Sequence, residues 1–163
     1  MYHWPSEAEL KTAAQLAQEG YLSTVKFMKV QKKNISEISS DNIGKLVSIV
    51  SDEVYIVNGT PVSLLDTIMA SVQAKKLYLR NVSLSEENTR ALVTAMRARV
   101  QVVELWKVTL DPELLSSYDG KGHCSKLEFG DTLVRYRVRL KRWAGDRRWK
   151  VTRDDEILRI ERQ

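Results

Sequence analysis

Histidine and cysteine are the residue types most often used for nucleophilic and metal chemistry, and this chain has few of them. Its histidines are His3 and His123, and its one cysteine is Cys124. No carboxylate lies at a spacing that would orient the His123 imidazole, and a structural zinc site needs more cysteine or histidine ligands than the chain contains. We therefore predict no catalytic residue, no metal site and no cofactor, and we interpret Cys124 as a small core residue.

A lysine between two glycines is the nearest feature to a phosphate-binding loop. The stretch Gly120-Lys-Gly122 is shorter than the glycine frame of such a loop, and no helix is expected directly after it. We therefore expect a protein that is not an enzyme and that has no small-molecule substrate.

Cations gather near one end of the chain. Between Arg135 and Arg153 there are nine basic residues and one acid, Asp146, whereas the whole chain carries a net charge of +5. Interleaved with aromatic side chains, these cations could bind nucleic acid or another polyanion. The alternative is a terminal helix that packs its apolar side inward and keeps its arginines in water. The candidate anion-binding residues are Arg135, Arg137, Arg139, Lys141, Arg142, Arg147 and Arg148.

A short strand pattern, apolar residue, any residue, apolar residue, recurs along the chain and indicates the elements that must position these side chains. It occurs at Val25-Lys-Phe27, Val54-Tyr-Ile56, Leu77-Tyr-Leu79, Val103-Glu-Leu105 and Leu127-Glu-Phe129, at intervals of 29, 23, 26 and 24 residues. We predict five parallel strands in chain order, with these apolar residues inward. The residues expected to be almost fully buried are Leu77, Leu79, Leu92, Met96, Val103, Leu105, Leu127 and Phe129.

Helical patterns with their own start signals lie between these strands. Ser6 with Glu9, and Ser83 with Glu86, have the spacing of a capping box. The first of these predicts a helix from Ser6 to Glu19 that covers the N-terminal end. Residues 133–144 fit both a strand and a helix, and the alternation of elements favours a helix over 132–144. Two strands around Trp149 and Ile157 are expected to follow it as a closing pair.

The stretch from Lys76 to Leu105, KLYLRNVSLSEENTRALVTAMRARVQVVEL, resembles a leucine-rich repeat, and most of all the long ribonuclease-inhibitor type. The repeats are degenerate, since Val30, Val82 and Val108 stand where the commonest repeat has asparagine. The resemblance implies one α/β domain over 1–163. It would be a short leucine-rich-repeat-like solenoid of about five parallel strands with helices on the opposite face. An N-terminal helix and a C-terminal helix with the strand pair would close its ends.

The resemblance also implies a binding surface, because the residues between the inward apolar positions face outward on the concave side of the sheet. The outward residues we select as partner-binding are Met28, Tyr55, Tyr78, Arg80 and Trp106. They belong to types that dominate protein interfaces, so we predict binding to another protein or to a second copy of the chain. The alternative is a set of scattered surface aromatic residues, or aromatic residues covered by a terminal segment.

Overall composition is that of one ordinary globular domain. The chain has 163 residues, of which 43% are hydrophobic, and it has no low-complexity stretch. Its start lacks the pattern of a secretory signal, and no apolar run approaches the roughly 20 residues that span a bilayer. We therefore expect a cytoplasmic protein.

Overall fold

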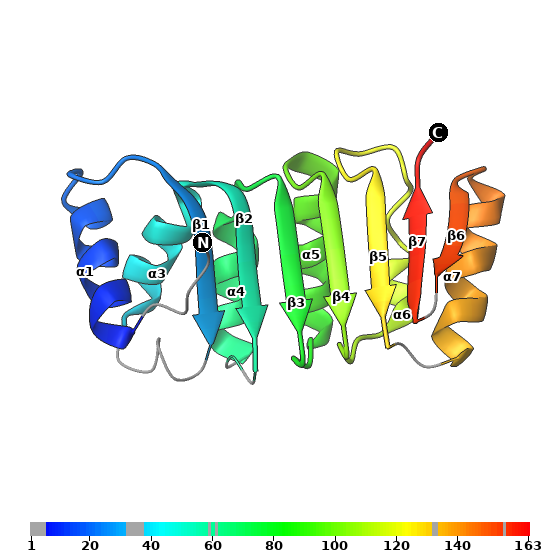
Figure 1. Ribbon diagram of the computed structural model, residues 1–163, viewed down its shortest axis with the longest axis horizontal. Helices are drawn as coiled ribbons and strands as arrows, with labels where there is room; N and C mark the ends of the chain where they lie inside the picture. The colour runs from blue at the N-terminus through cyan, green and yellow to red at the C-terminus, as the bar shows by residue number, and fades with distance from the viewer. Residues whose placement is uncertain (1–5, 32–37, 59, 61, 132–133, 155) are drawn as a thin grey trace.

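The computed structural model describes residues 6–31, 38–58, 60, 62–131, 134–154 and 156–163. In this part of the chain seven strands form one sheet, in the spatial order β1-β2-β3-β4-β5-β7-β6 (Figure 1). The strands are β1 (Val25–Gln31), β2 (Val50–Val57), β3 (Lys76–Arg80), β4 (Val102–Trp106), β5 (Lys126–Gly130), β6 (Lys150–Asp154) and β7 (Ile157–Glu161). The helices are α1 (Glu7–Gln18), α3 (Ser40–Ser48), α4 (Val62–Ser71), α5 (Glu86–Ala98), α6 (Pro112–Leu115) and α7 (Val134–Asp146).

The first five strands lie side by side in chain order and are parallel, which confirms the prediction from the recurring apolar pattern. A helix lies between each of these strands and the next in the chain, as parallel neighbours require a crossover connection. The predicted closing pair is also confirmed, since β7 is antiparallel to β5 and β6 is antiparallel to β7. The resulting sheet is mixed, mostly parallel and not closed.

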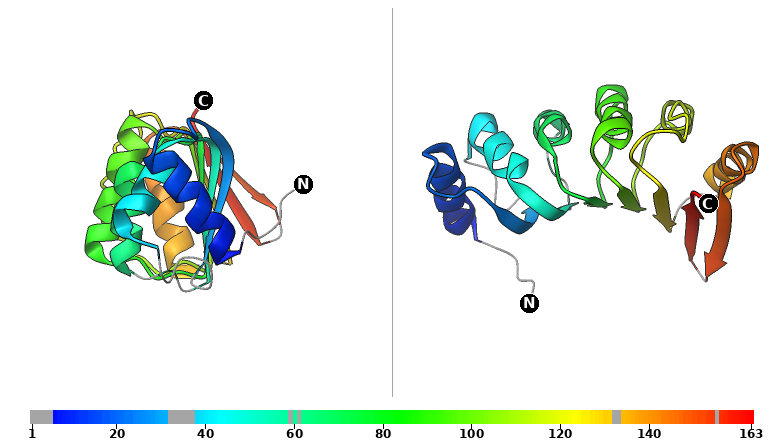
Figure 2. Two further views of the ribbon diagram at one scale, coloured as in Figure 1. Left: turned by 90° about the vertical axis from the view of Figure 1, so that its left-hand side faces the viewer. Right: turned by 90° about the horizontal axis from the view of Figure 1, so that it is seen from above.

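The described helices lie on one side of the sheet, as the right-hand view of Figure 2 shows. The opposite side of the sheet carries none of them, and we call it the open face. At the N-terminal end α1 packs beside α3 and buries Leu10, Ala14 and Ala17. At the C-terminal end α7 lies beside β6. Residues 132 and 133, where the predicted helix was to begin, lie outside the described residues.

Capping explains where two of the helices begin. Ser6 and Glu9 form the predicted capping box, in which the Glu9 backbone N–H donates to Ser6 Oγ at 3.1 Å. The box predicted for Ser83 and Glu86 is wrong, because Ser85 caps α5 and pairs with Asn88. Ser83 instead forms a parallel bridge with Thr109, which holds it in extended backbone.

The core is built from the inward rows of the sheet and the facing sides of the helices. Leu77, Val103 and Leu127 are neighbours in one row, and Leu79, Leu105 and Phe129 are neighbours in the next. These six side chains, together with Leu92 and Met96 of α5, are at most 2% exposed. The predicted core is therefore confirmed for all eight residues.

The inward register of β1 differs from the prediction. Val25 and Phe27 were expected to face inward, yet Phe27 is 37% exposed and Met28 and Val30 are buried. The pairing with β2 is irregular between Val25 and Phe27, so the alternation of side chains restarts with Met28 on the core side. Phe27 and Lys29 consequently occupy outward positions.

An aromatic cluster fastens the C-terminal elements to the rest of the fold. The Trp143 indole N–H donates to the carbonyl of Tyr118 at 3.0 Å, and the Trp143 ring lies 5.1 Å from that of Trp149. The Arg147 guanidinium lies 4.5 Å from the Trp143 ring, and the Arg162 guanidinium 5.2 Å from the Trp149 ring. Cation–π contacts and a buried hydrogen bond therefore hold α7 and the last strands in place.

Leu79→Ala should lower the free energy of unfolding by about 2 to 5 kcal/mol, because a fully buried leucine leaves a cavity when it is truncated. Urea denaturation followed by circular dichroism measures the change. The matched control is Leu16→Ala in α1, since that side chain is 39% exposed. An equal loss of stability in the two variants would contradict the inward row of β3.

Candidate binding surface on the open face of the sheet

The open face brings together aromatic side chains from three adjacent strands. Tyr55 of β2 is the pairing neighbour of Tyr78 in β3, and Arg80 of β3 is the pairing neighbour of Trp106 in β4. Because adjacent strands are about 4.8 Å apart, these four side chains occupy one surface. The structure thus places together four of the five residues that the sequence selects as partner-binding.

The fifth residue, Met28, is wrong as an outward contact. Its side chain is 4% exposed and belongs to the core, where it is the pairing neighbour of Val54. The register irregularity in β1 moves Met28 to the core side and Lys29 to the open face, next to Tyr55. Sequence reasoning missed Lys29 for the same reason.

The rings of Tyr55 and Tyr78 pack against each other, and Tyr55 also contacts two charged side chains. Their ring centroids are 5.3 Å apart with an interplanar angle of 51°, and the Tyr55 hydroxyl donates to a carboxylate oxygen of Glu53. The Lys29 ammonium lies 5.5 Å from the Tyr55 ring centroid. Burial raises the pKa of Tyr78, and the nearby Arg80 partly opposes that shift. Both rings are half-buried, so each presents part of its surface to solvent.

The Trp106 ring lies over Gly130 of the neighbouring strand. A Cβ atom added at Gly130 would overlap the Trp106 indole, so the absence of a side chain at that position makes room for the ring. The indole N–H donates to Glu104 Oε1 at 2.6 Å. Gly130 therefore has a structural function at the surface that its sequence position alone did not indicate.

Two carboxylates of the open face, Glu104 and Glu128, are paired with cations of the same face. Glu104 Oε2 lies 2.9 Å from Lys76 Nζ, and Glu128 Oε1 lies 3.0 Å from Lys126 Nζ and 3.7 Å from Arg159 Nε. Burial lowers the pKa of Lys76, but the hydrogen bond and charge of Glu104 and other nearby carboxylates raise it by more, so its pKa is above the usual value. The surface around β4 and β5 is consequently close to neutral.

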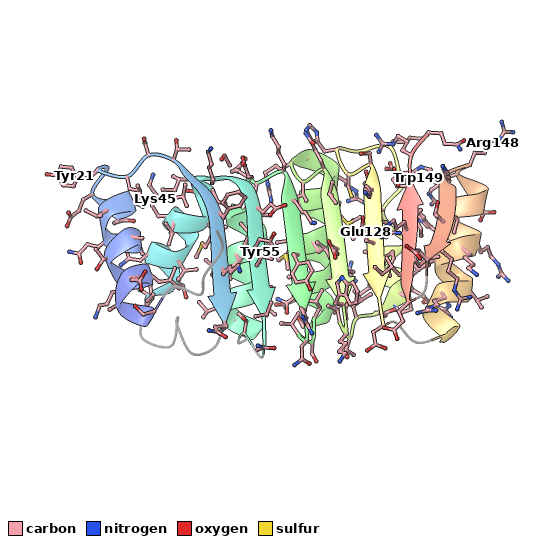
Figure 3. All side chains as sticks on the ribbon, in the orientation of Figure 1. Tyr21, Lys45, Tyr55, Glu128, Arg148 and Trp149 are labelled. Carbon is pink, nitrogen blue, oxygen red and sulfur yellow. The ribbon has the colours of Figure 1, made fainter. Side chains whose placement is uncertain are left out.

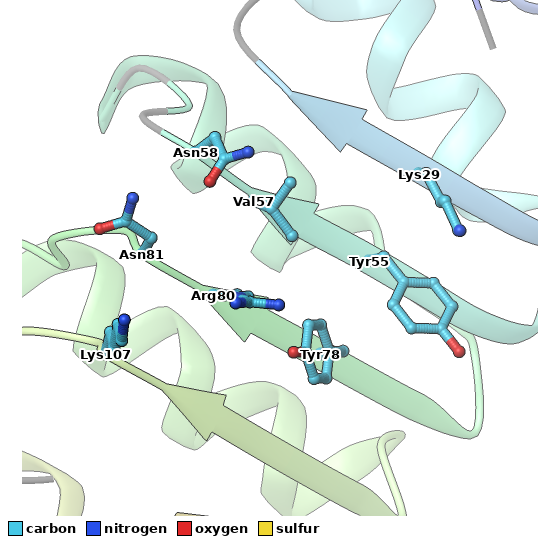
Figure 4. A pocket seen from close by; sticks show the side chains of 8 residues that line it. All are labelled: Lys29, Tyr55, Val57, Asn58, Tyr78, Arg80, Asn81 and Lys107. Atoms are coloured by element: carbon cyan, nitrogen blue, oxygen red, sulfur yellow. The ribbon is translucent and has the colours of Figure 1, made fainter. Parts of the chain in front are cut away.

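A hollow of about 570 Å³ lies beside the tyrosines, at the carboxyl ends of the strands (Figure 4). The residues that line it are Lys29, Tyr55, Val57, Asn58, Tyr78, Arg80, Asn81 and Lys107. Asn58, Asn81 and Lys107 each follow the last residue of a strand and have φ values of 51°, 55° and 51°. An asparagine directly after a strand is a signal for this left-handed conformation, and it could have located two of these residues from the sequence.

The basic segment lies apart from this surface. Figure 3 shows Arg148 at the end of the molecule opposite Tyr21, with Tyr55 between them. Arg139 pairs with Glu113 at 3.0 Å, Arg137 donates to the carbonyl of Glu156, and Arg147 donates to the carbonyl of Asp119. Lys141, Arg142 and Arg148 are exposed and have no ion pair in the described part of the chain. The side chain of Arg135 lies outside the described residues.

His123 and Cys124 are not among the residues that line the hollow on the open face. His123 is exposed and Cys124 is buried, whereas His3 lies outside the described residues. Burial raises the pKa of the Cys124 thiol to about 11. Among the residues described, no group of three or more histidine, cysteine, aspartate or glutamate side chains could hold a metal ion. In the same part of the chain, none of the helices combines the length and the apolarity needed to cross a membrane.

The buried Cys124 thiol should make stability fall at high pH. In the unfolded chain the thiol has its ordinary pKa of 9.0, so it ionises at a lower pH than the buried thiol of the folded protein. The contribution of the neutral Cys124 thiol to the free energy of unfolding is complete below pH 9. It is lost between about pH 9 and pH 11, at about 1.4 kcal/mol per pH unit. Urea denaturation at several pH values should show this decline in the wild type and a flatter dependence in Cys124→Ala. Identical pH dependence in both proteins would contradict the buried neutral thiol.

Gly130→Ala should displace the Trp106 indole, because the new methyl group takes the place of the ring, and should destabilise the fold by about 1 to 3 kcal/mol. The Trp106 indole N–H resonance in the ¹H–¹⁵N spectrum is assigned by its loss in Trp106→Phe. It should shift in Gly130→Ala, because the hydrogen bond from the indole to Glu104 breaks. Gly145→Ala is the matched control, since its Cβ would meet nothing within 4 Å. A resonance that stays unchanged in Gly130→Ala would contradict this packing.

Comparisons of the chain with protein-family models, with curated protein sequences and with solved structures found no match. The function must accordingly be inferred from the chemistry of the two surfaces.

Proposed function

We propose that this chain is a non-enzymatic protein-interaction module that binds another protein, or a second copy of itself, through the open face of its sheet. The observation that carries the proposal is the surface formed by Tyr55, Tyr78 and Trp106 on three adjacent strands. Tyrosine, tryptophan and arginine are enriched among the residues that contribute most to protein–protein affinity. Arg80, which is exposed beside these rings, adds the third of these residue types.

The side chains of this surface are held in fixed positions, which supports the proposal further. The Tyr55 hydroxyl is held by Glu53, and the Trp106 indole is held by Glu104 and lies over Gly130. Side chains that are fixed before binding lose less conformational entropy when a partner arrives. The seven strands span about 30 Å at the usual strand spacing, which is wide enough for an ordinary protein interface.

We also propose that the array is a short solenoid of the leucine-rich-repeat type, with the open face on its concave side. The repeated unit of strand, turn and helix supports this, and so does a shared feature of the turns. The residue after each of β2, β3 and β4 is left-handed, and its N–H donates to the last carbonyl of the next strand. These bonds run from Asn58 to Arg80, from Asn81 to Trp106 and from Lys107 to Gly130. The expected cytoplasmic location stays a prediction.

Binding of nucleic acid or another polyanion through the basic segment 135–153 is the second candidate. The exposed side chains of Lys141, Arg142 and Arg148 favour it, since they lack ion pairs in the described part of the chain. The intramolecular contacts of Arg137, Arg139 and Arg147 weigh against it. We rank it second because three of these six cations already have a structural contact.

The double variant Tyr78→Ala with Trp106→Ala should lose the partner while keeping its fold, because neither side chain belongs to the buried core. Partners captured from cell extract on the immobilised wild type are purified and titrated calorimetrically against each variant. The dissociation constant should rise by at least about 30-fold, which corresponds to roughly 2 kcal/mol. Sedimentation of the wild type at several concentrations tests whether the partner is a second copy.

The matched control is Tyr21→Ala, since Tyr21 is 80% exposed and lies away from the sheet face. It should bind like the wild type. The proposal is wrong if Lys141→Glu with Arg142→Glu abolishes binding while the Tyr78 and Trp106 double variant binds normally. In that case binding should also weaken steeply with salt concentration.

A further inference from the structure

The charged residues that line the hollow on the open face are all cations. Its described lining contains the cations Lys29, Arg80 and Lys107 and no carboxylate. The side-chain amides of Asn58 and Asn81 add further hydrogen-bond donors to the same lining. An anionic group that entered this space would meet cations from several strands at once.

Two of these cations are little neutralised by carboxylates in the described part of the chain. Arg80 is exposed and interacts with the neutral Tyr78 hydroxyl, and in the described part of the chain it has no ion pair. Lys107 lies 3.7 Å from Asp131, and both side chains are more than half exposed, so that pair is weak. The carboxylates Glu104 and Glu128, by contrast, are already paired with lysines.

The geometry suits a short peptide segment. Figure 4 shows Arg80 near the middle of the hollow, Asn81 and Lys107 toward the carboxyl ends of the strands, and Tyr55 on the opposite side. The volume of about 570 Å³ exceeds the size of one carboxylate and falls in the usual range for ligand sites. Tyr55 and Tyr78 also line the hollow, and their half-buried rings favour contact with an apolar side chain.

We propose that this hollow is the subsite for an acidic segment of the partner protein. A glutamate or aspartate side chain binds between Arg80 and Lys107, and a neighbouring apolar side chain lies against Tyr55 and Tyr78. This inference rests on the proposed function and adds the chemistry of the partner to it. A guanidinium suits the purpose because it can form two parallel hydrogen bonds with one carboxylate.

A peptide fits the surface better than a nucleic acid does. A phosphate backbone needs a track of cations along its length. The row of outward side chains that begins with Lys29 and the tyrosines continues with Glu104 and Glu128. This row therefore offers no continuous track of cations across the sheet.

An NMR titration of the ¹⁵N-labelled whole chain tests the proposal. The probe is a blocked hexapeptide with four glutamates around a central phenylalanine and glycine, added up to about 5 mM. We expect shifts at Asn58, Arg80 and Asn81, and a dissociation constant at least about 10-fold weaker in Arg80→Gln. The same peptide with glutamine in place of glutamate should bind at least about 10-fold more weakly.

Arg142→Gln is the matched control, because Arg142 is an exposed arginine of α7 and should not affect the peptide. Shifts confined to α7, weakening by Arg142→Gln alone, or no shift at the highest peptide concentration would each overturn the inference. Stronger binding of a single-stranded oligothymidylate of equal charge at the same residues would overturn it as well, in favour of nucleic acid.

Failure of this inference can be told apart from failure of the proposed function. With the captured partner, Arg80→Gln combined with Lys107→Gln should weaken binding at least about 10-fold. If that variant binds normally while Tyr78→Ala with Trp106→Ala loses the partner, the open face is the binding site but its partner is not acidic there. If neither variant changes binding, the proposed function is wrong.

Discussion

The hydrogen-bonded register between parallel strands is the constraint on which the rest of this structure depends. Since side chains alternate along a strand, placing Leu77 and Leu79 in the core also places Tyr78 and Arg80 on the open face. Parallel pairing then repeats this arrangement from strand to strand, so that Leu79 lies beside Leu105. A shift of one residue in β3 would expose two buried leucines and bury a guanidinium. The stability of the core therefore determines which residues a partner can reach.

Charged residues have different physical functions in different parts of the described structure. On the open face near β4 and β5, lysines neutralise Glu104 and Glu128, which keeps a half-buried surface free of unpaired carboxylates. At the C-terminal end, arginines stack on indoles and bind backbone carbonyls, as Arg147 does with Trp143. At the hollow, Arg80 interacts with the Tyr78 hydroxyl but has no ion pair in the described part of the chain. Many of the cations in the sequence thus stabilise the fold, and only some of them are available to bind a partner.

Much of the fold could be predicted because spacing and alternation are written directly in the sequence. The apolar pairs at Leu77 and Val103 begin strands that lie beside each other, and the intervals between them leave room for a helix. The inward register of β1 could not be predicted in the same way, since VKFMKV offers apolar residues in both registers and only the irregular pairing with β2 selects Met28. The hollow was not predicted, because the asparagines after β2 and β3 signal their own turns but do not show that side chains from neighbouring strands enclose a space. The function of Gly130 was not predicted, because the approach of the Trp106 ring from the neighbouring strand has no local sequence signal.

Site-specific photo-crosslinking tests most directly whether the open face is the binding surface. A benzophenone amino acid replaces Tyr78 on the open face in one sample and Val138 in another. Val138 is a suitable comparison because it is 56% exposed on α7, beside the basic side chains. After irradiation with the partner, we predict a covalent adduct from position 78 and none from position 138. An adduct from position 138 alone would contradict the account and would assign binding to the basic helix.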